Sequence, residues 1–172
     1  DERIWFGGLN GVYRYDGKHF QQLTMEDGLP ANQVWGLLPE PDGSMLIGTA
    51  HGIVRYRPTA TTPPPIDIRE VVADQVYRNP TVLELTATQG QPGRLSLLTI
   101  SYHGTSFTTS KMRYSFILEG HDKGWQDTWE TSVRYEKLPV GEYTFKVIAI
   151  NRDLVPSETP AVLKLKVAPD PR

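Results

Sequence analysis

A short repeat near the start of the chain places the strongest limit on its fold. Residues 4–15 read IWFGGLNGVYRY, and residues 45–56 read MLIGTAHGIVRY. Four pairs of identical residues define the match: Gly7 and Gly48, Gly11 and Gly52, Arg14 and Arg55, Tyr15 and Tyr56. Repeats of this size do not bury their own apolar face, so they are stable only when several copies stack. The chain has room for fewer than two complete structural repeats of this kind. We therefore expect an incomplete repeat fold.

The second copy predicts short antiparallel strands. Residues 34–38, 45–49 and 53–56 are apolar runs separated by turn residues, and residues 18–24 offer a fourth strand. A four-stranded unit with a spacing near 41 residues has the size of a β-propeller blade. Gly48 and Gly52 then suit tight turns with positive φ, or a close approach of backbone. We predict about one and a half blades over residues 1–57.

A run of three prolines separates this part from the rest. Residues 58–65 contain Pro63, Pro64 and Pro65, which favour a short, stiff linker. Residues 66–168 have the size of an immunoglobulin-like or fibronectin-III-like β-sandwich. Seven strands are predicted there, over residues 66–72, 81–85, 95–102, 112–118, 132–136, 143–150 and 161–167. The predicted fold class is all-β, with residues 169–172 as a tail.

Composition excludes several kinds of site. The 172 residues include 18 basic and 20 acidic side chains and no cysteine. Without a basic block there is no electrostatic footprint for nucleic acid, and without cysteine there is no disulfide, thiol nucleophile or thiolate metal ligand. No apolar run reaches the ~20 residues of a membrane helix. We expect no membrane contact within these residues, and we expect any export signal or anchor to lie outside them.

The stretch LPVGEY at residues 138–143 is the sharpest local signal. Pro139 and Gly141 shape a turn, and Tyr143 opens a strand with alternating apolar positions. This arrangement fits a tyrosine corner, in which the phenol binds backbone a few residues upstream.

The chain resembles two families in a characteristic order. Residues 112–125 (MRYSFILEGHDKGW), residues 132–135 and residues 138–143 are similar to the triple-tyrosine (Y_Y_Y) domain, and its three tyrosines match Tyr114, Tyr135 and Tyr143. The first part resembles the two-component regulator propeller repeat through Gly-Leu-Pro at 28–30, Ile-Gly-Thr at 47–49 and the glycine-to-tyrosine run at 52–56. Together the resemblances cover nearly the whole chain.

The resemblance implies the periplasmic sensor region of a bacterial hybrid two-component histidine kinase. It implies propellers that bind oligosaccharides, followed by the triple-tyrosine domain, a membrane helix and a kinase or another output. We therefore expect a non-catalytic chain that forms a homodimer, contacts upstream propeller blades, and relays ligand binding by a dimer rearrangement. Oligosaccharide binding is expected only in the full-length sensor.

No catalytic, cofactor or metal site is predicted. The histidines, at 19, 51, 103 and 121, are far apart and are expected in turns or at the surface, and neither a nucleophile elbow nor a phosphate loop occurs. Trp125 and Trp129 are the candidate ligand contacts, since exposed indoles stack on sugar rings; the alternative is that Trp125 covers the sandwich core. An exposed pair would favour a second function, a fibronectin-like carbohydrate-binding or adhesive module of a secreted protein.

Overall fold

The structure is a computed structural model, and it describes residues 3–59 and 61–172. Asp1 and Glu2, at the start of the predicted blade region, and Ala60, in the predicted linker, lie outside the described residues. The chain divides into two units. Unit 1 comprises Asp1–Pro64 together with Ser106–Arg113 and Ile150–Pro156, and unit 2 comprises the remaining residues. Two segments within the predicted sandwich range therefore fold with unit 1.

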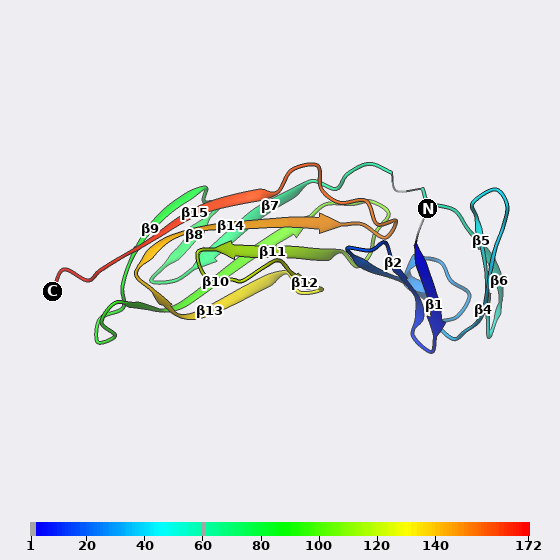
Figure 1. Ribbon diagram of the computed structural model, residues 1–172, viewed down its shortest axis with the longest axis horizontal. Coiled ribbons are helices and arrows are strands. Elements are labelled where there is room, and N and C mark those ends of the chain that lie inside the picture. Colours follow the sequence, from blue (N-terminus) through cyan, green and yellow to red (C-terminus); the bar gives the residue numbers. More distant parts are fainter. Residues whose placement is uncertain (1–2, 60) are drawn as a thin grey trace. The chain divides into compact units, whose positions relative to one another are not determined.

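Unit 1 contains two three-stranded antiparallel sheets (Figure 1). Sheet 1 has the order β1-β2-β3, and sheet 2 has the order β4-β5-β6. The strand bounds are β1 Ile4–Gly8, β2 Gly11–Tyr15, β3 Phe20–Leu23, β4 Val34–Pro39, β5 Met45–Thr49 and β6 Gly52–Tyr56. A 3₁₀ helix, η1, spans Met25–Asp27 and is capped by Thr24, whose hydroxyl accepts a hydrogen bond from the backbone N–H of Glu26 at 3.3 Å.

The core of unit 1 lies between these two sheets. Val12 and Leu23 of sheet 1, Leu29 of the connecting loop and Ile47 of sheet 2 form its buried cluster. Trp5 and Tyr56 pack beside the cluster and meet edge to face, with ring centroids 5.5 Å apart. The two sheets therefore share one apolar core that neither sheet could form alone.

One predicted strand pairs differently from the expectation. Residues 18–24 were expected to complete a four-stranded unit with the second repeat copy. Instead β3 pairs with β2, in the register Val12 to Leu23 and Tyr15 to Phe20. The short turn at Asp16, whose side chain accepts hydrogen bonds from the backbone N–H groups of Lys18 and His19, returns the chain directly beside β2. A two-copy repeat thus gives two sheets of three strands.

Unit 2 is a β-sandwich of two sheets (Figure 1). Sheet 3 has the order β13-β10-β7-β8, and sheet 4 has the order β12-β11-β14-β15-β9. The strand bounds are β7 Ile66–Val72, β8 Val76–Arg78, β9 Val82–Thr86, β10 Arg94–Gly104, β11 Arg113–Glu119, β12 Gln126–Thr128, β13 Ser132–Pro139, β14 Gly141–Ile150 and β15 Ala161–Ala168. All seven predicted sandwich strands are confirmed, with small shifts at their ends. The short strands β8 and β12 were not predicted.

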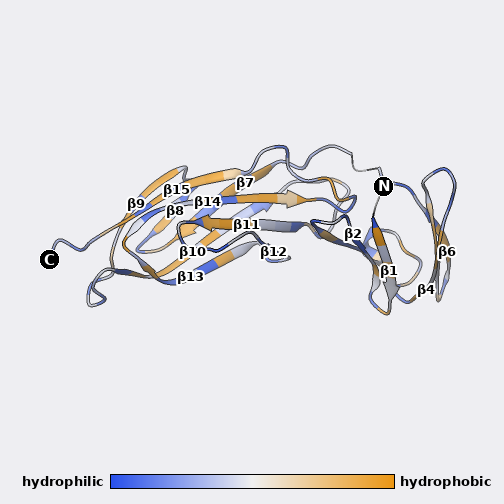
Figure 2. Ribbon diagram, in the orientation of Figure 1, coloured by the Kyte–Doolittle hydropathy of each residue, from blue (hydrophilic) through white to orange (hydrophobic). Residues whose placement is uncertain are grey.

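Alternating apolar residues build the core of the sandwich. Phe145 and Val147 of β14 and Leu163 of β15 are fully buried, whereas Lys164 and Lys166 of β15 point to the other face of sheet 4. Figure 2 shows the resulting pattern of apolar positions along β14 and β15. This period of two confirms the all-β fold. Among the described residues, no helix is long and apolar enough to cross a membrane.

Candidate functional site: the buried arginine centre

The most unusual polar group of unit 1 is the Arg14 side chain. Arg14 lies on the central strand β2, on the face that points to sheet 2, and is 0% exposed. It donates a hydrogen bond to the Tyr56 hydroxyl at 2.8 Å and another to the Arg152 carbonyl oxygen. Its guanidinium carbon also lies 5.4 Å from the ring centroid of Trp5 and 5.2 Å from that of Tyr56, within cation–π distance.

Burial changes the electrostatics of this group. Desolvation lowers the pKa of Arg14 to about 10, although the nearby Asp153 carboxylate raises it in part. The Arg14 Nη1 atom lies 3.9 Å from Asp153 Oδ1, and both side chains are almost completely buried. Arg14 Nε is buried without a hydrogen-bond partner. A buried charge of this kind persists only where the surrounding structure holds its partners in place.

The segment 150–156 supplies those partners through a tight turn. The side-chain oxygen of Asn151 accepts hydrogen bonds from the backbone N–H groups of Asp153 and Val155, at 2.9 and 3.0 Å. Leu154, which is buried, has a φ of 63°. A non-glycine residue with positive φ carries strain of order 1–3 kcal/mol and requires support from its neighbours. The turn therefore presents the Arg152 carbonyl and the Asp153 carboxylate in a fixed geometry.

Further hydrogen bonds tie the same segment to sheet 1 and to the chain after sheet 2. Gln21 Nε2 of β3 donates to the carbonyl oxygens of Ile150 at 2.9 Å and Lys111 at 3.4 Å. The backbone N–H of Thr59 donates to Asp153 Oδ2 at 3.0 Å, and Arg152 Nη2 donates to Thr59 Oγ1 at 3.1 Å. The arginine centre thus joins sheet 1, segment 150–156 and the start of the predicted linker.

Tyr114, Tyr135 and Tyr143, the three tyrosines singled out by the resemblance, form no common site. Each hydroxyl instead fixes a loop or strand end of unit 2: Tyr114 accepts from the Gly104 N–H at 3.1 Å, Tyr135 donates to Asp122 Oδ2 at 2.9 Å, and Tyr143 donates to the Pro139 carbonyl at 2.7 Å. The Tyr143 bond is the predicted tyrosine corner.

Burial raises the pKa of all three of these phenols. For Tyr135 the hydrogen bond to Asp122 adds to the effect of burial, so its pKa lies far above the ordinary value. The pKa values of Tyr114 and Tyr143 are also raised, chiefly by burial. These phenols therefore stay neutral and act as hydrogen-bonding groups that hold the sandwich together.

The glycines of the predicted set have different roles. Gly52 has a φ of 132° in the turn between β5 and β6, as a tight turn requires. Gly48 lies within β5 and has no positive φ, and a Cβ there would make only ordinary contact with the Gly36 carbonyl. Gly48 therefore does not serve a turn, and the expectation that it lies where a propeller channel needs backbone without bulk stays a prediction. Gly141 begins β14 beside the Tyr143 ring.

The two candidate tryptophans differ in exposure. Trp125 is 49% exposed, and Trp129 is half-buried. About half of the Trp125 side chain is therefore covered by the protein, and its packing on the sandwich core stays a prediction. The short strand β12 lies at the edge of sheet 4 and pairs with β11 in the register Tyr114 to Thr128. Trp125 directly precedes this edge strand and so remains accessible to solvent.

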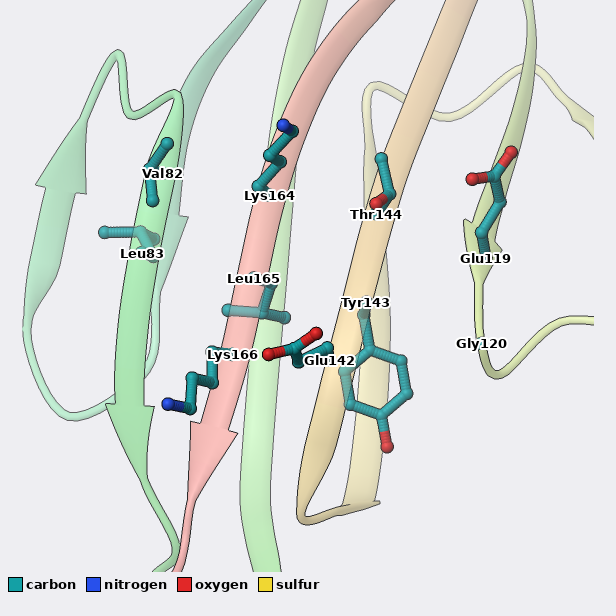
Figure 3. A pocket seen from close by; sticks show the side chains of 10 residues that line it. All are labelled: Val82, Leu83, Glu119, Gly120, Glu142, Tyr143, Thr144, Lys164, Leu165 and Lys166. Carbon is teal, nitrogen blue, oxygen red and sulfur yellow. The ribbon is translucent and has the colours of Figure 1, made fainter.

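A cavity of about 590 Å³ lies over sheet 4 (Figure 3). Its charged lining residues are Lys164, Lys166, Glu119 and Glu142, and Val82 and Leu83 of β9 form one side. Both signs of charge are present, and the sheet register places Glu142 opposite Lys166. The lining therefore carries no one-sided charge that would select an anion or a cation.

Histidines and acidic groups do not converge on a metal site in the part of the chain that the structure describes. His51, His103 and His121 are exposed, as expected. His19 lies in the turn before β3, as expected, but it is only 5% exposed and so is not a surface residue.

Sequence reasoning noted Arg14 only as a repeat position and missed Asn151 and Asp153. One signal was available, since the polar run Asn151-Arg152-Asp153 directly follows an apolar strand. Nothing in the sequence connected that run with Arg14, which lies 139 positions before Asp153.

The family model described as the Y_Y_Y domain matches residues 105–168. No curated protein sequence matches the chain. Among solved structures, the fold is similar to that described as the extracellular domain of the candidate hybrid two component system BT3049 from B. thetaiotaomicron. The identity is 19%, the match covers 98% of this chain and 25% of the other, and the TM-score is 0.66.

A second similar structure is described as the extracellular domain of the candidate one component system BT4673 from the same organism. The identity is 20%, with 97% of this chain and 24% of the other covered and a TM-score of 0.50. The chain thus spans about a quarter of the length of each of these two structures. At these identities the likeness establishes the fold.

Proposed function

We propose that the chain is a non-catalytic part of a bacterial extracytoplasmic sensor, located in the periplasm. It relays ligand binding on an upstream propeller to a membrane helix and a cytoplasmic histidine kinase or another output. One observation carries this proposal: a Y_Y_Y match over residues 105–168 lies within a chain whose fold resembles 25% of a structure described as the extracellular domain of a two-component system.

The relay uses the arginine centre as its joint. Arg14 holds the Arg152 carbonyl, and segment 150–156 directly precedes the loop into β15, the last strand of the chain. A displacement of sheet 1 therefore moves segment 150–156 with it. If the two separated, the buried Arg14 guanidinium would lose its hydrogen-bond partner, and solvent does not reach it to replace that partner. In a homodimer, two such displacements change the spacing or rotation of the segments that follow β15.

The first experiment measures dimer geometry in the full-length sensor. Spin labels at position 162, on the exposed side of β15, report the distance between the two copies with and without a panel of oligosaccharides. A ligand-dependent change in that distance is expected. An unchanged distance, in a sensor that binds the oligosaccharide and activates its output, rejects the dimer relay.

The joint itself is tested by the double substitution Arg14→Met with Asp153→Asn in the same sensor. This pair removes the buried charges together, so the fold should persist. Ligand binding upstream is expected to remain while the distance change at position 162 is lost. Full retention of that change assigns the arginine centre a purely structural role.

Exposure of Trp125 favours one second function. A half-exposed indole at a sheet edge is suited to stacking on a sugar ring, as in a carbohydrate-binding or adhesive module of a secreted protein. The sensor proposal expects no tight oligosaccharide binding by these 172 residues alone. Calorimetry with the isolated chain decides between the two, and micromolar binding that is lost in Trp125→Ala would favour the second function.

A further inference from the structure

The edge strands of the sandwich differ in how well they are protected against pairing with another strand. Short length, lysine or other charged side chains, proline and irregular backbone are the usual protections. In sheet 3, β8 has three residues, and β13 carries Arg134 and Lys137, the latter with a φ of 54°. In sheet 4, β12 also has three residues. The least protected edge strand is β9, whose five residues read VLELT and include a single charge, at Glu84.

The hydrogen bonds of β9 show which of its peptide groups face the open edge. Among the described residues, β9 pairs with one strand, β15, in parallel orientation (Figure 3). The Thr81 carbonyl accepts from the Lys164 N–H at 2.9 Å, and the Ala87 N–H donates to the last residue of β15 at 2.8 Å. Peptide groups along a strand point alternately to its two sides. Those of Val82 and Glu84 therefore face away from β15, toward the open edge.

We propose that β9 pairs in antiparallel orientation with β9 of a second copy, so that sheet 4 continues from one copy into the other. Adding a strand to an exposed edge is a common mode of recognition. The contact is isologous, because both copies use the same strand, and it is complete with two copies. This inference rests on the proposed homodimer and names its interface.

The register is centred on Leu83. Val82 of each copy then lies opposite Glu84 of the other, and the outward peptide groups of these residues bond to each other in both directions. The two Leu83 side chains, which are half-buried, meet on the core side of the sheet. A register centred on Glu84 would instead place two carboxylates directly opposite each other, which is unfavourable.

The charges on the outer face of sheet 4 suit this register. Within one copy, Lys164 lies opposite Val82 and Lys166 lies opposite Glu84. Across the joined sheet, one row then reads Lys164 and Val82 of the first copy, followed by Glu84 and Lys166 of the second. Each carboxylate therefore lies between a lysine of its own chain and an apolar side chain of the other. Val82, which is 69% exposed in one copy, becomes covered.

The contact is small, so association should be weak in dilute solution. Two five-residue strands are expected to bury less than the roughly 1,200 Å² at the lower limit of stable interfaces. Two copies held in the same membrane would meet at a higher effective concentration. Because β15 lies directly beside β9, the two β15 strands would be three strand spacings apart, about 14 Å. The segments that follow β15 would thus start close together.

Introduced cysteines test the pairing, because the chain contains none of its own. Leu83→Cys places two thiols opposite each other, at the ~4.5 Å Cα separation of a non-hydrogen-bonded pair, which a disulfide can span. Under mild oxidation this variant should form linked dimers at least ten times faster than Val76→Cys, the control on the exposed edge strand β8. Equal rates for the two variants overturn the proposal.

A proline variant tests whether the open edge itself makes the contact. Glu84→Pro removes an N–H that faces away from β15, so the sandwich should keep its fold by circular dichroism. Added to Leu83→Cys, it should lower the rate of cross-linking to that of Val76→Cys. An unchanged rate in the folded double variant overturns the proposal.

The register is tested without proline by Val82→Cys and Glu84→Cys. In each variant alone the two thiols are two residues out of register, whereas an equimolar mixture places them opposite each other. The mixture should cross-link at least ten times faster than either component. A mixture no faster than its components overturns the register and, with it, the proposal.

The same cysteines in the full-length sensor separate this inference from the relay. A sensor that shows a ligand-dependent distance at position 162 but no cross-link through β9 would overturn the interface and leave the relay standing. A sensor that cross-links through Leu83→Cys but shows no change in distance with ligand would support the interface and reject the relay.

Discussion

Arg14 and Arg55 occupy the same position in the two repeat copies, yet their surroundings are opposite. Arg14 is fully buried, whereas the Arg55 side chain is 53% exposed and pairs with Glu40, the two atoms Nε and Oε1 being 2.6 Å apart. The difference comes from sheet 2 and segment 150–156, which enclose only the first arginine. A residue's role in a repeat is therefore set by what covers its face.

Arg14→Met should destabilise the chain strongly, because it leaves the Asp153 carboxylate buried without its cationic neighbour. A loss of about 3–5 kcal/mol in the free energy of unfolding is expected by urea denaturation. Arg55→Met is the matched control and should cost only a small fraction of that loss. Adding Asp153→Asn to Arg14→Met should restore much of the stability, and a double variant as unstable as the single one would contradict this account.

The buried phenols predict a loss of stability in alkali. The pKa values of Tyr102, Tyr114, Tyr135 and Tyr143 are raised in the folded chain. The unfolded chain releases these protons near pH 10, while the folded chain retains them. Their contribution to stability is thus fully present below pH 10 and falls as the pH rises above it.

Urea denaturation at several pH values above and below 10 measures this dependence. Tyr135→Phe should make the decline shallower, because it removes the phenol that burial and Asp122 affect together. Desolvation of Arg14 acts in the opposite direction but involves a single group, so the net change should remain a decline. Stability that rises between pH 10 and pH 11 would contradict the expected sign.

At the scale of elements, the turn between β1 and β2 depends on a glycine. Gly11 has a φ of 102°, and a Cβ there would lie 2.1 Å from the Leu23 carbonyl oxygen of β3. Gly17, in the turn before β3, also has a positive φ of 93° but faces open space. A side chain would therefore be strained by the backbone at either position, but only at Gly11 would it also meet a steric contact.

Gly11→Ala should lower the thermal unfolding midpoint clearly more than Gly17→Ala. In both variants an alanine at positive φ destabilises the fold by about 1 kcal/mol. Only Gly11→Ala also pushes β3 away from β2. Thermal unfolding followed by circular dichroism compares the two variants directly. Equal losses would mean that the close approach to Leu23 is relieved at little cost.

For the whole molecule, the division into units predicts which amides open together. Segments 106–113 and 150–156 belong to unit 1, although strands of unit 2 flank them in the sequence. Hydrogen exchange of the Asp153 and Val155 amides should therefore follow sheets 1 and 2. In Arg14→Met, these amides should exchange faster together with β2, while β14 amides between Tyr143 and Val147 stay protected.

This prediction distinguishes a discontinuous unit from a simple chain of two domains. If the chain unfolded as two domains divided only at the prolines, the Asp153 and Val155 amides would keep the protection of β14 in the variant. That outcome would also remove the joint on which the proposed relay depends.

Much of the fold followed from local patterns. The alternation of Tyr143, Phe145 and Val147 predicted β14, because one side of a half-buried strand must be apolar. The stretch around Pro139 and Gly141 predicted the tyrosine corner, because a tight turn brings the Tyr143 phenol back to nearby backbone. The strands β8 and β12 escaped prediction because three residues are too few to show a period.

The sequence by itself determined the two repeat copies, the sandwich strands and the tyrosine corner, because each depends on residues close together in the chain. Only the tertiary structure decided the pairing of β3 with β2, the exposure of Trp125 and the enclosure of Arg14 by segment 150–156. Those outcomes depend on contacts between distant segments. Burial, which lowers the pKa of Arg14, is a property of the packed chain that no local pattern contains.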